Sequence, residues 1–210
     1  MRRLQHGFHD DLWVERSRTL QKGLRSHLQA TIDTMICGRE RAVFFNGSTS
    51  LYVANWRSPS ESIYSFRLLI ITAAKYEQLL LAEWDKEELL KGDFLVVYIR
   101  SGYLVLVFDP GRALTELVHP HSLPRNRWFD VHVWRKDKQA GLTIDNVSVT
   151  TDVQGVALAV NSNSGLYIGG VPEGHNVPDV LPLHGFLGCA IDLKLNNHPR
   201  SLMKLMQSKQ

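Results

Sequence analysis

From residue 41 onward the sequence predicts an all-β fold, either an antiparallel sandwich or a barrel. Short apolar runs recur at roughly ten-residue spacing, turn residues fall between them, and no helical pattern separates them. At 210 residues the chain is long enough to bury a hydrophobic core, and a content of 44% hydrophobic and 21% charged residues is typical of folded proteins.

The first 40 residues follow a different pattern. Apolar side chains recur at intervals of four, four, four and three, and basic residues lie between or beside them. This periodicity predicts an amphipathic helix that ends near Gly38. The helix could pack on the domain or on a neighbour upstream, and the stretch is too short to favour a coiled coil or a membrane-surface role. The apolar positions are Leu20, Leu24, Leu28, Ile32 and Met35.

The strand candidates follow in order. The segment 41–56 holds two short apolar runs about a Gly-Ser turn, and the segment 128–135 alternates strictly, with Phe129, Val131 and Val133 on one face. Further runs lie at 62–74, 78–84, 92–108, 141–151, 165–170 and 185–197.

The stretch 92–111, GDFLVVYIRSGYLVLVFDPG, predicts a β-hairpin. It has two alternating apolar runs around a short turn. Asp93 stands where the first strand begins, and Asp109-Pro110 follows the second, so three polar or turn-forming residues meet at the open end. The pattern alone leaves open whether this end holds a ligand or is only a capped hairpin.

Catalytic signatures are missing from the sequence. It contains no GxSxG, HExxH, P-loop or dinucleotide-binding pattern, and its acidic residues form no acid–base pair that spacing supports. The HPH motif at His119 and His121 is more typical of a solvated loop than of a metal pair, and His132 of a surface or hydrogen-bonded interior histidine. The sequence therefore predicts a protein that is not an enzyme.

Charge and hydropathy exclude other classes of function. A net charge of +3 without a block of basic residues does not indicate nucleic-acid binding. No apolar run approaches the ~20 residues of a membrane span, and the N-terminus lacks the apolar stretch of a signal peptide. The chain would then either lack a secretion signal or be a fragment of a longer protein.

Two sequons match the N-glycosylation acceptor pattern. They are Asn46-Gly47-Ser48 and Asn146-Val147-Ser148, both at expected turns. Asn46 and Asn146 would carry glycans only in a secreted protein.

The order of these motifs, from residue 41 to 197, resembles that of laminin G-like domains, the modules of laminins, neurexins, agrin, perlecan and slit. Two blocks carry the resemblance most specifically: LYIGGVPE at 166–173 and GFLGCAIDLKLNN at 185–197. The segments AVFFNGSTSLYV, SIYSFRLL, QLLLAEW, RNRWFDVHVWR and AGLTID, together with the hairpin, match other family strands in the same order.

The resemblance implies a jelly-roll-like sandwich of about fourteen strands, related to the concanavalin fold, that binds without catalysis. It divides the chain into an N-terminal helical segment or linker (1–40), the laminin G-like domain (41–197) and a C-terminal tail (198–210). It also implies an extracellular or cell-surface location, as one part of a larger mosaic protein.

Members of this family often hold calcium at the rim of the sandwich, which implies a site here. The matching positions are the Asp93 carboxylate, the backbone carbonyls of Pro110 and Ala159, and the side-chain oxygen of Asn161. Calcium takes such oxygen ligands, and a single carboxylate predicts weak affinity, on the order of 10⁻⁴–10⁻³ M. Both Asp93 and Asn161 are equally at home in unliganded turns.

The cysteines depart from the family pattern. The family cysteine at position 189 usually pairs with one further downstream, and this chain has none there. Cys37 could pair with Cys189, or could belong with a neighbouring module. We expect Cys37 and Cys189 not to be paired with each other.

The predicted partner is a cell-surface or matrix protein, or an acidic glycan such as heparan sulfate. Basic residues near one strand could assist polyanion binding, although a solvated surface explains them as well. The alternatives are a lectin-like or carbohydrate-processing protein on a similar sandwich, and a truncated structural module without calcium. The basic residues are Arg125, Arg127, Arg135, Lys136 and Lys138.

Overall fold

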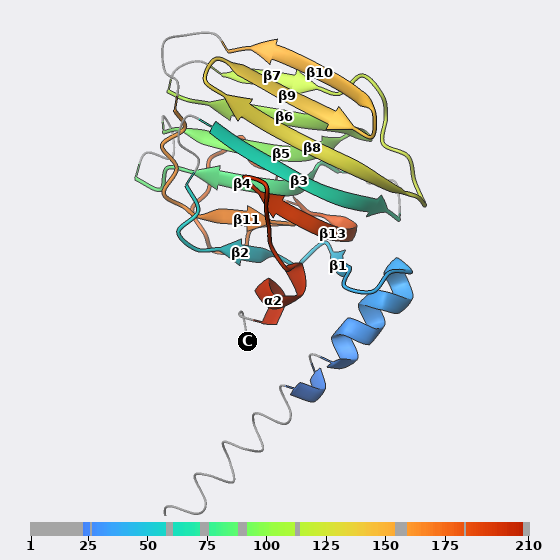
Figure 1. Cartoon of the computed structure of the whole chain (residues 1–210). Helices are drawn as coiled ribbons and strands as arrows, with labels where there is room; N and C mark the ends of the chain where they lie inside the picture. The colour runs from blue at the N-terminus through green and yellow to red at the C-terminus, as the bar shows by residue number, and fades with distance from the viewer. Residues whose placement is uncertain are drawn as a thin grey trace, which may run out of the picture.

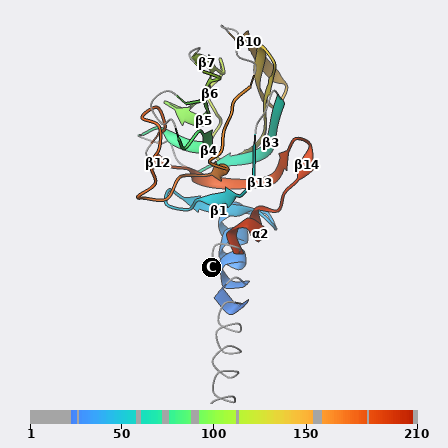
Figure 2. The ribbon, with the colours of Figure 1, turned by 90° about the vertical axis from the view of Figure 1, so that its left-hand side faces the viewer.

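The computed structural model of the chain describes residues 23–25, 27–57, 61–71, 76–87, 92–111, 114–153, 159–182 and 184–207. Two β-sheets of seven strands each lie face to face, with a helix preceding them (Figure 1). The view in Figure 2 separates the two layers, with β4 to β7 in one and β3, β10 and β13 in the other. The predicted antiparallel sandwich with an N-terminal helix is confirmed.

The first sheet, sheet A, has the order β1-β13-β3-β8-β9-β10, and β14 pairs with β13 at its side. Neighbouring strands are antiparallel. The register between β13 and β3 shifts between Ile191 and Lys194, which marks a bulge in β13. The strands are β1 (Val43–Asn46), β3 (Glu61–Ile70), β8 (Trp128–Lys136), β9 (Gln139–Ile144), β10 (Val147–Asp152), β13 (Leu187–Leu195) and β14 (His198–Pro199).

The second sheet, sheet B, has the order β2-β11-β4-β5-β6-β7, and β12 pairs with β4 in parallel. The two apolar runs of segment 41–56 therefore enter different sheets, since β1 pairs with β13 and β2 with β11. The strands are β2 (Leu51–Val53), β4 (Gln78–Trp84), β5 (Phe94–Arg100), β6 (Tyr103–Asp109), β7 (Thr115–Val118), β11 (Leu166–Ile168) and β12 (His184–Gly185).

The main hydrophobic core lies between the two sheets. Side chains of a strand alternate between its faces, and in β8 Phe129, Val131 and Val133 are buried in this core, as the alternating pattern predicts. The opposite face of β8 carries Asp130 and His132, which are exposed or half-buried. Sheet A therefore has one apolar face in the core and one polar face outside.

The outer face of sheet B is covered by chain rather than by solvent. A second apolar cluster joins Trp84 and Phe94 to Leu181, with Val171 and Val177 packed against it. The connection between β11 and β12 supplies the last three residues, so this segment shields sheet B from outside. Among the residues that the structure describes, the apolar cluster on the outer face of sheet A is the one at the disulfide described next.

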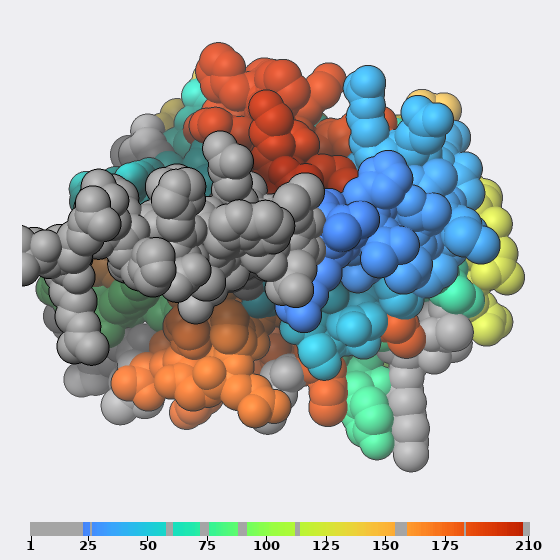
Figure 3. All heavy atoms as spheres, turned by 90° about the horizontal axis from the view of Figure 1, so that it is seen from below, coloured from blue at the N-terminus to red at the C-terminus, as the bar shows by residue number. Residues whose placement is uncertain are grey.

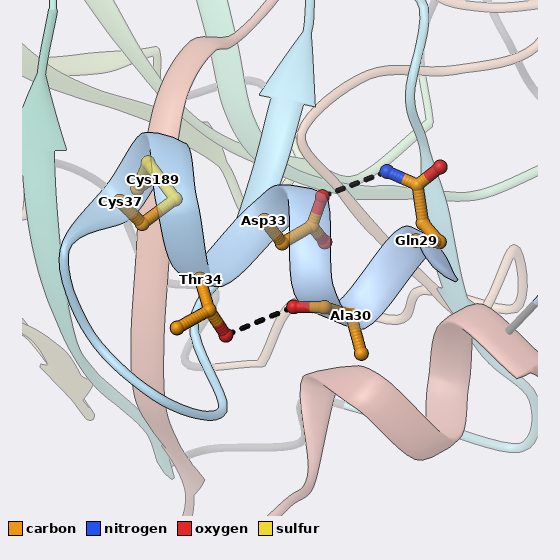
Figure 4. The surroundings of a disulfide bond; sticks show 6 residues. All are labelled: Gln29, Ala30, Asp33, Thr34, Cys37 and Cys189. Carbon is orange, nitrogen blue, oxygen red and sulfur yellow. Dashed lines mark hydrogen bonds between the residues drawn. A yellow bond between two sulfur atoms is a disulfide. The ribbon is translucent and has the colours of Figure 1, made fainter. Parts of the chain in front are cut away.

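The N-terminal helix is attached to sheet A by a disulfide, so the expectation of unpaired cysteines is wrong. Cys37 at the end of the helix bonds Cys189 of β13, with 5.8 Å between the two Cα atoms (Figure 4). That separation suits a disulfide. The bond lies in a small buried cluster with Ala42. The missing downstream cysteine is thus replaced by one upstream of the sandwich.

The helix turns a polar face to the domain and its apolar stripe away from it. The structure describes it at residues 23–25 and 27–37. Asp33 is fully buried, and Gln29 Nε2 donates a hydrogen bond to its Oδ1 at 2.7 Å (Figure 4). The helix (blue) lies at the surface in Figure 3. The predicted apolar row does not pack on the described part of the domain, because Leu24, Leu28, Ile32 and Met35 are 47–79% exposed.

A short helix, α2 (Leu202–Gln207), follows the last strand. Leu202 is buried in the main core, so residues after 197 help to close the sandwich. The division into segments 1–40, 41–197 and 198–210 stays a prediction. Within the described residues, no helix is both long and apolar enough for a membrane span.

Candidate functional site

The open end of the β5–β6 hairpin forms part of the rim of the sandwich. Phe94 pairs with Asp109, so Asp93 and Pro110 lie opposite each other just beyond the paired residues. Asp109 Oδ1 accepts a hydrogen bond from the Gly111 N–H at 2.8 Å, which fixes the turn. A Cβ on Gly111 would stand 3.3 Å from Asp93 Oδ1, so this carboxylate lies over the turn backbone.

Asn161 reaches the same carboxylate from a distant loop. Its backbone N–H donates to Asp93 Oδ2 at 2.7 Å, and its side-chain Nδ2 donates to the same oxygen at 2.9 Å. The structure therefore brings together two of the four predicted calcium-ligand positions, Asp93 and Asn161. Rotating the Asn161 side-chain amide by half a turn would place its oxygen, the atom that a cation binds, where Nδ2 now lies.

A buried carboxylate holds the loop that carries Asn161. Glu83 is fully buried at the end of β4 and accepts hydrogen bonds from the Tyr64 hydroxyl and from Ser162 Oγ, at 2.5 and 2.6 Å. Ser162 directly follows Asn161, so the interior of the sandwich fixes the backbone beside the rim position. Sequence reasoning missed this network, although a lone Glu in the otherwise apolar stretch LLLAEW is a visible signal.

The next two loop residues are tied to the end of β4. Ser164 Oγ accepts from the Trp84 N–H at 2.9 Å, and the N–H groups of Asn163 and Ser164 donate to the Trp84 carbonyl. The Asn163 side chain accepts from the Lys86 N–H and donates to Asp85. The three residues directly after the contact with the hairpin are thus all hydrogen-bonded to β4 or to the residues that follow it.

Two further predicted ligand positions lie nearby in the chain. Pro110 is buried and follows β6, and Ala159 is half-buried, two residues before Asn161. Across the described part of the chain, no three His, Cys, Asp or Glu residues gather as a metal cluster. The oxygens available at the rim are those of one carboxylate, one amide and backbone carbonyls, a set that suits calcium better than a transition metal.

Arg135 is not a surface residue. It is 1% exposed and points into the sandwich, and burial lowers its pKa, an effect that Tyr64 and Glu83 oppose. It therefore cannot contribute to a surface patch for polyanions.

The other basic residues near β8 are divided between its two ends. Arg125 and Arg127 precede the strand, whereas Lys136 and Lys138 lie at its far end. Nine residues of strand span roughly 26 Å, so these four do not form one patch. Arg127 is also paired with Asp145 at 2.8 Å.

His119 is buried rather than solvated, which corrects the expectation for the HPH motif. Its Nδ1 and Nε2 lie 3.2 and 3.1 Å from the carbonyl oxygens of His121 and Val147. His119 thus connects the end of β7 to β10, while His121 is exposed.

Both sequon asparagines are exposed. Asn46 ends β1, and its Oδ1 accepts hydrogen bonds from the N–H groups of Ser48 and Thr49. Asn146 lies in the tight turn between β9 and β10.

Comparison with known proteins gives consistent results. The family model described as "Laminin G domain" matches residues 79–198. Neurexin-4 of Drosophila melanogaster is 32% identical over 109 residues, which is 51% of this chain and 8% of the relative. Neurexin-2 of Mus musculus is 25% identical over 127 residues, 56% of this chain and 7% of the relative. The basement membrane proteoglycan of Caenorhabditis elegans is 26% identical over 112 residues, 53% and 3%. The chain thus spans less than a tenth of the length of these relatives.

Among solved structures, the LG1-3 region of the laminin alpha2 chain superposes with a TM-score of 0.69 at 20% identity. The superposition covers 78% of this chain and 32% of that one. A pentraxin from Limulus polyphemus shares the fold at a TM-score of 0.55 and 11% identity, with 79% of each chain covered. The family match spans more than half of the chain, and the two-sheet sandwich superposes on the laminin structure. The chain belongs to the laminin G domain family, whose members are non-catalytic binding modules.

Proposed function

We propose that the chain is an extracellular adhesion or receptor-binding module that uses calcium at its rim. The observation that carries this proposal is the contact between Asp93 and Asn161, two oxygen-bearing side chains 68 residues apart. Its partner would be a cell-surface or matrix protein, or an acidic glycan such as heparan sulfate.

The proposed ligands are the Asp93 carboxylate, the Asn161 side-chain oxygen and the carbonyls of Pro110 and Ala159. Asp93 lies between Asn161 and the turn that contains Pro110 and Gly111, so two of the other three proposed positions flank its carboxylate. With one formal negative charge among its ligands, a bound calcium ion would keep positive charge for an anionic group of the partner.

The extracellular location is supported by the disulfide, because such bonds persist in oxidising compartments. The exposure of Asn46 and Asn146 is compatible with glycosylation there. Membership of a larger mosaic protein is supported by the relatives, of which the chain spans 3–8%.

The test is thermal unfolding during a calcium titration into the millimolar range. Binding to the native state alone stabilises it by about 1.4 kcal/mol at ten times the Kd. Wild type should gain stability with calcium, and Asp93→Ala should not. Asp152→Ala, which removes an exposed carboxylate at the end of β10, is the matched control and should respond like wild type.

The readout is the calcium-dependent change within each variant, so any loss of starting stability in Asp93→Ala does not affect it. Equal responses of wild type and Asp93→Ala, or no response of wild type to millimolar calcium, would refute the rim site. The latter result would favour the alternative of a structural module without calcium.

A further inference from the structure

The helix before β1 exposes a row of apolar side chains that neither the fold nor the rim site uses. None of them belongs to an apolar cluster within the part of the chain that the structure describes. Apolar side chains gathered in this way on the surface of a folded domain mark an interaction site. We call this row the helix stripe. It consists of Leu24, Leu28, Ile32, Met35 and Ile36, which are 43–79% exposed.

Two attachments fix the direction in which the helix stripe points. Cys37 is bonded to Cys189 of β13, and Asp33 is fully buried against the domain (Figure 4). At 3.6 residues per turn, Leu24 lies about 180° around the helix from Asp33. The disulfide keeps the helix from rolling over, so the helix stripe stays on the side away from the domain, where another molecule can reach it.

The helix stripe is complementary to a second copy of itself. Four of its residues follow one another at intervals of four and so form one ridge of the helix surface. Ridges of this spacing interdigitate with each other in the commonest class of helix packing, at a crossing angle of about −50°. Each copy of the chain supplies one such ridge, which is what a two-fold interface requires. The four residues are Leu24, Leu28, Ile32 and Ile36.

Charge decides the direction in which the two helices run. Asp33 is buried, and Arg25 is exposed and borders the helix stripe. In a parallel pair the two Arg25 side chains would face each other. An antiparallel pair places Leu24 against Ile36 of the second copy. Arg25 then lies beside Met35 of the second copy, and the two Arg25 residues are about 15 Å apart along the helix axis. That separation exceeds the Debye length of about 8 Å, so the antiparallel pair avoids the repulsion.

We propose that the chain forms a two-fold symmetric dimer in which the helix stripes of two copies pack antiparallel. The helices meet on the sides that face away from their own domains, so the two domains lie on opposite sides of the helix pair. A single pair of short helices buries less than the ~1,200–2,000 Å² typical of stable interfaces, so the dimer is weak and depends on concentration. Its formation needs neither calcium nor the rim residues.

The polar face of the helix favours a second copy over a lipid surface. Helices that lie in a membrane surface carry Lys and Arg opposite their apolar side, and Trp or Phe on it. Here the residues opposite the helix stripe are Gln29, Ala30 and Asp33, which are buried or half-buried against the domain. The helix stripe itself holds no aromatic side chain. The face that would interact with lipid headgroups is therefore already occupied by the domain.

The proposal is tested by sedimentation equilibrium of the disulfide-bonded full chain in EDTA, at about 0.01–1 mM, a range suited to weak dissociation constants. Wild type should show a monomer–dimer equilibrium. Leu28→Ser should weaken it at least tenfold, because the two-fold symmetry removes the side chain twice. Leu114→Ser removes a similarly exposed leucine outside the helix, so it is the matched control and should leave the equilibrium unchanged. Melting temperatures should stay the same, because both leucines are exposed.

A charge at position 35 tests the antiparallel arrangement. Met35→Glu would place a carboxylate beside Arg25 of the second copy, and Met35→Lys would place a like charge there. At low salt the dimer of Met35→Lys should be at least fivefold weaker than that of Met35→Glu, and high salt should remove most of the difference. In a parallel pair each substituted residue would face its own copy, and the two dimers would be equally weak.

Several results would overturn the proposal. They are a wild type that stays monomeric at the highest concentration, equal effects of Leu28→Ser and Leu114→Ser, and equal dimerisation of the two Met35 variants. Adsorption of monomeric wild type to phosphatidylserine vesicles, lost in Leu28→Ser, would assign the helix stripe to a lipid surface instead. Asp93→Ala should dimerise like wild type, so failure of the rim site and failure of the dimer are distinguishable.

Discussion

Asn161 donates two hydrogen bonds to one oxygen of Asp93, from its backbone N–H at 2.7 Å and from its side chain at 2.9 Å. The contact joins the loop before β11 to the start of β5, which belong to separate parts of the chain. Because Asn161 is uncharged, Asp93 is the only one of the two with a formal charge, and this sets the expected weakness of calcium binding.

Replacing Asn161 by Asp should strengthen calcium binding and weaken the calcium-free protein. A second carboxylate should lower the Kd by about tenfold. Without calcium, two like charges at this separation should destabilise the fold by about 1 kcal/mol or more. Thermal unfolding with and without calcium measures both effects. Asn163→Asp places the same charge beside Asp85 instead, so it should share the destabilisation without the gain in affinity. Identical calcium responses of the two variants would contradict the assignment of Asn161.

Tyr64→Phe should destabilise the protein by about 1–3 kcal/mol, because it removes a hydrogen bond to a buried carboxylate. Glu83 is fully buried and accepts this bond from the Tyr64 hydroxyl. Chemical denaturation measures the change. Tyr98→Phe, whose hydroxyl accepts a longer bond from Arg100 near the surface, is the control and should cost less. A Tyr64→Phe protein as stable as wild type would show that Glu83 does not depend on this bond.

Cys37→Ser/Cys189→Ser should lower the free energy of unfolding by about 2–5 kcal/mol, because the bond closes a long loop in the unfolded chain. The two cysteines are 152 residues apart. The melting temperature of wild type in reductant should fall toward that of the double variant, whose own melting temperature should not respond. Unchanged stability on reduction would argue against a closed disulfide in solution.

Asp33→Asn should stabilise the protein at neutral pH. Burial raises the pKa of Asp33 above its ordinary value of 3.8, an effect larger than the opposing hydrogen bonds from Gln29 and the Phe44 backbone. The native state therefore holds this proton more tightly than the unfolded state, and stability falls as the pH rises from 3.8 through the raised pKa. Asparagine lacks this titration, so the variant should gain stability at neutral pH and lose the advantage below the ordinary value. Melting curves across this range test the idea, and a constant difference at all pH values would contradict it.

Secretion from animal cells should add N-linked glycans at Asn46 and Asn146. Both asparagines are exposed, and the Asn46 oxygen, not its nitrogen, makes the hydrogen bonds of its turn. Asn46→Gln and Ser148→Ala should each remove one glycan, seen as a change in mass after enzymatic deglycosylation. Ser148→Ala keeps Asn146, so it separates loss of the acceptor pattern from loss of the side chain. An intact mass equal to that of the bare chain would contradict the prediction.

The sequence predicts the sandwich well because its strands follow a local rule. The alternation of residues 128–135 distinguishes core from surface correctly, since each side chain's face depends only on its place in the strand. The rim contact needs more than a local rule, because the family resemblance places Asp93 and Asn161 at one site and no periodicity connects them. The disulfide was predicted wrongly because pairing depends on where two distant segments pack, which spacing alone does not encode.

The burial of Arg135 and His119 shows the same limit. Arg135 continues the inward-facing series of Phe129, Val131 and Val133, so the alternation that places those three in the core also places Arg135 inside. A charged side chain predicts a surface position for Arg135, but its place in the alternating pattern is what decides its burial.

The bond between Cys37 and Cys189 also determines how the module carries mechanical load. Tension applied between a point before Cys37 and a point after Cys189 passes directly through the two sulfur atoms, and the residues between them bear none of it. Asp93, Asn161 and His132 all lie in that shielded segment, whereas Lys194, Arg200 and Lys204 lie beyond it. Pulling on the chain would therefore leave the rim undisturbed, while the force acts on the part of β13 beyond Cys189 and on the residues that follow it.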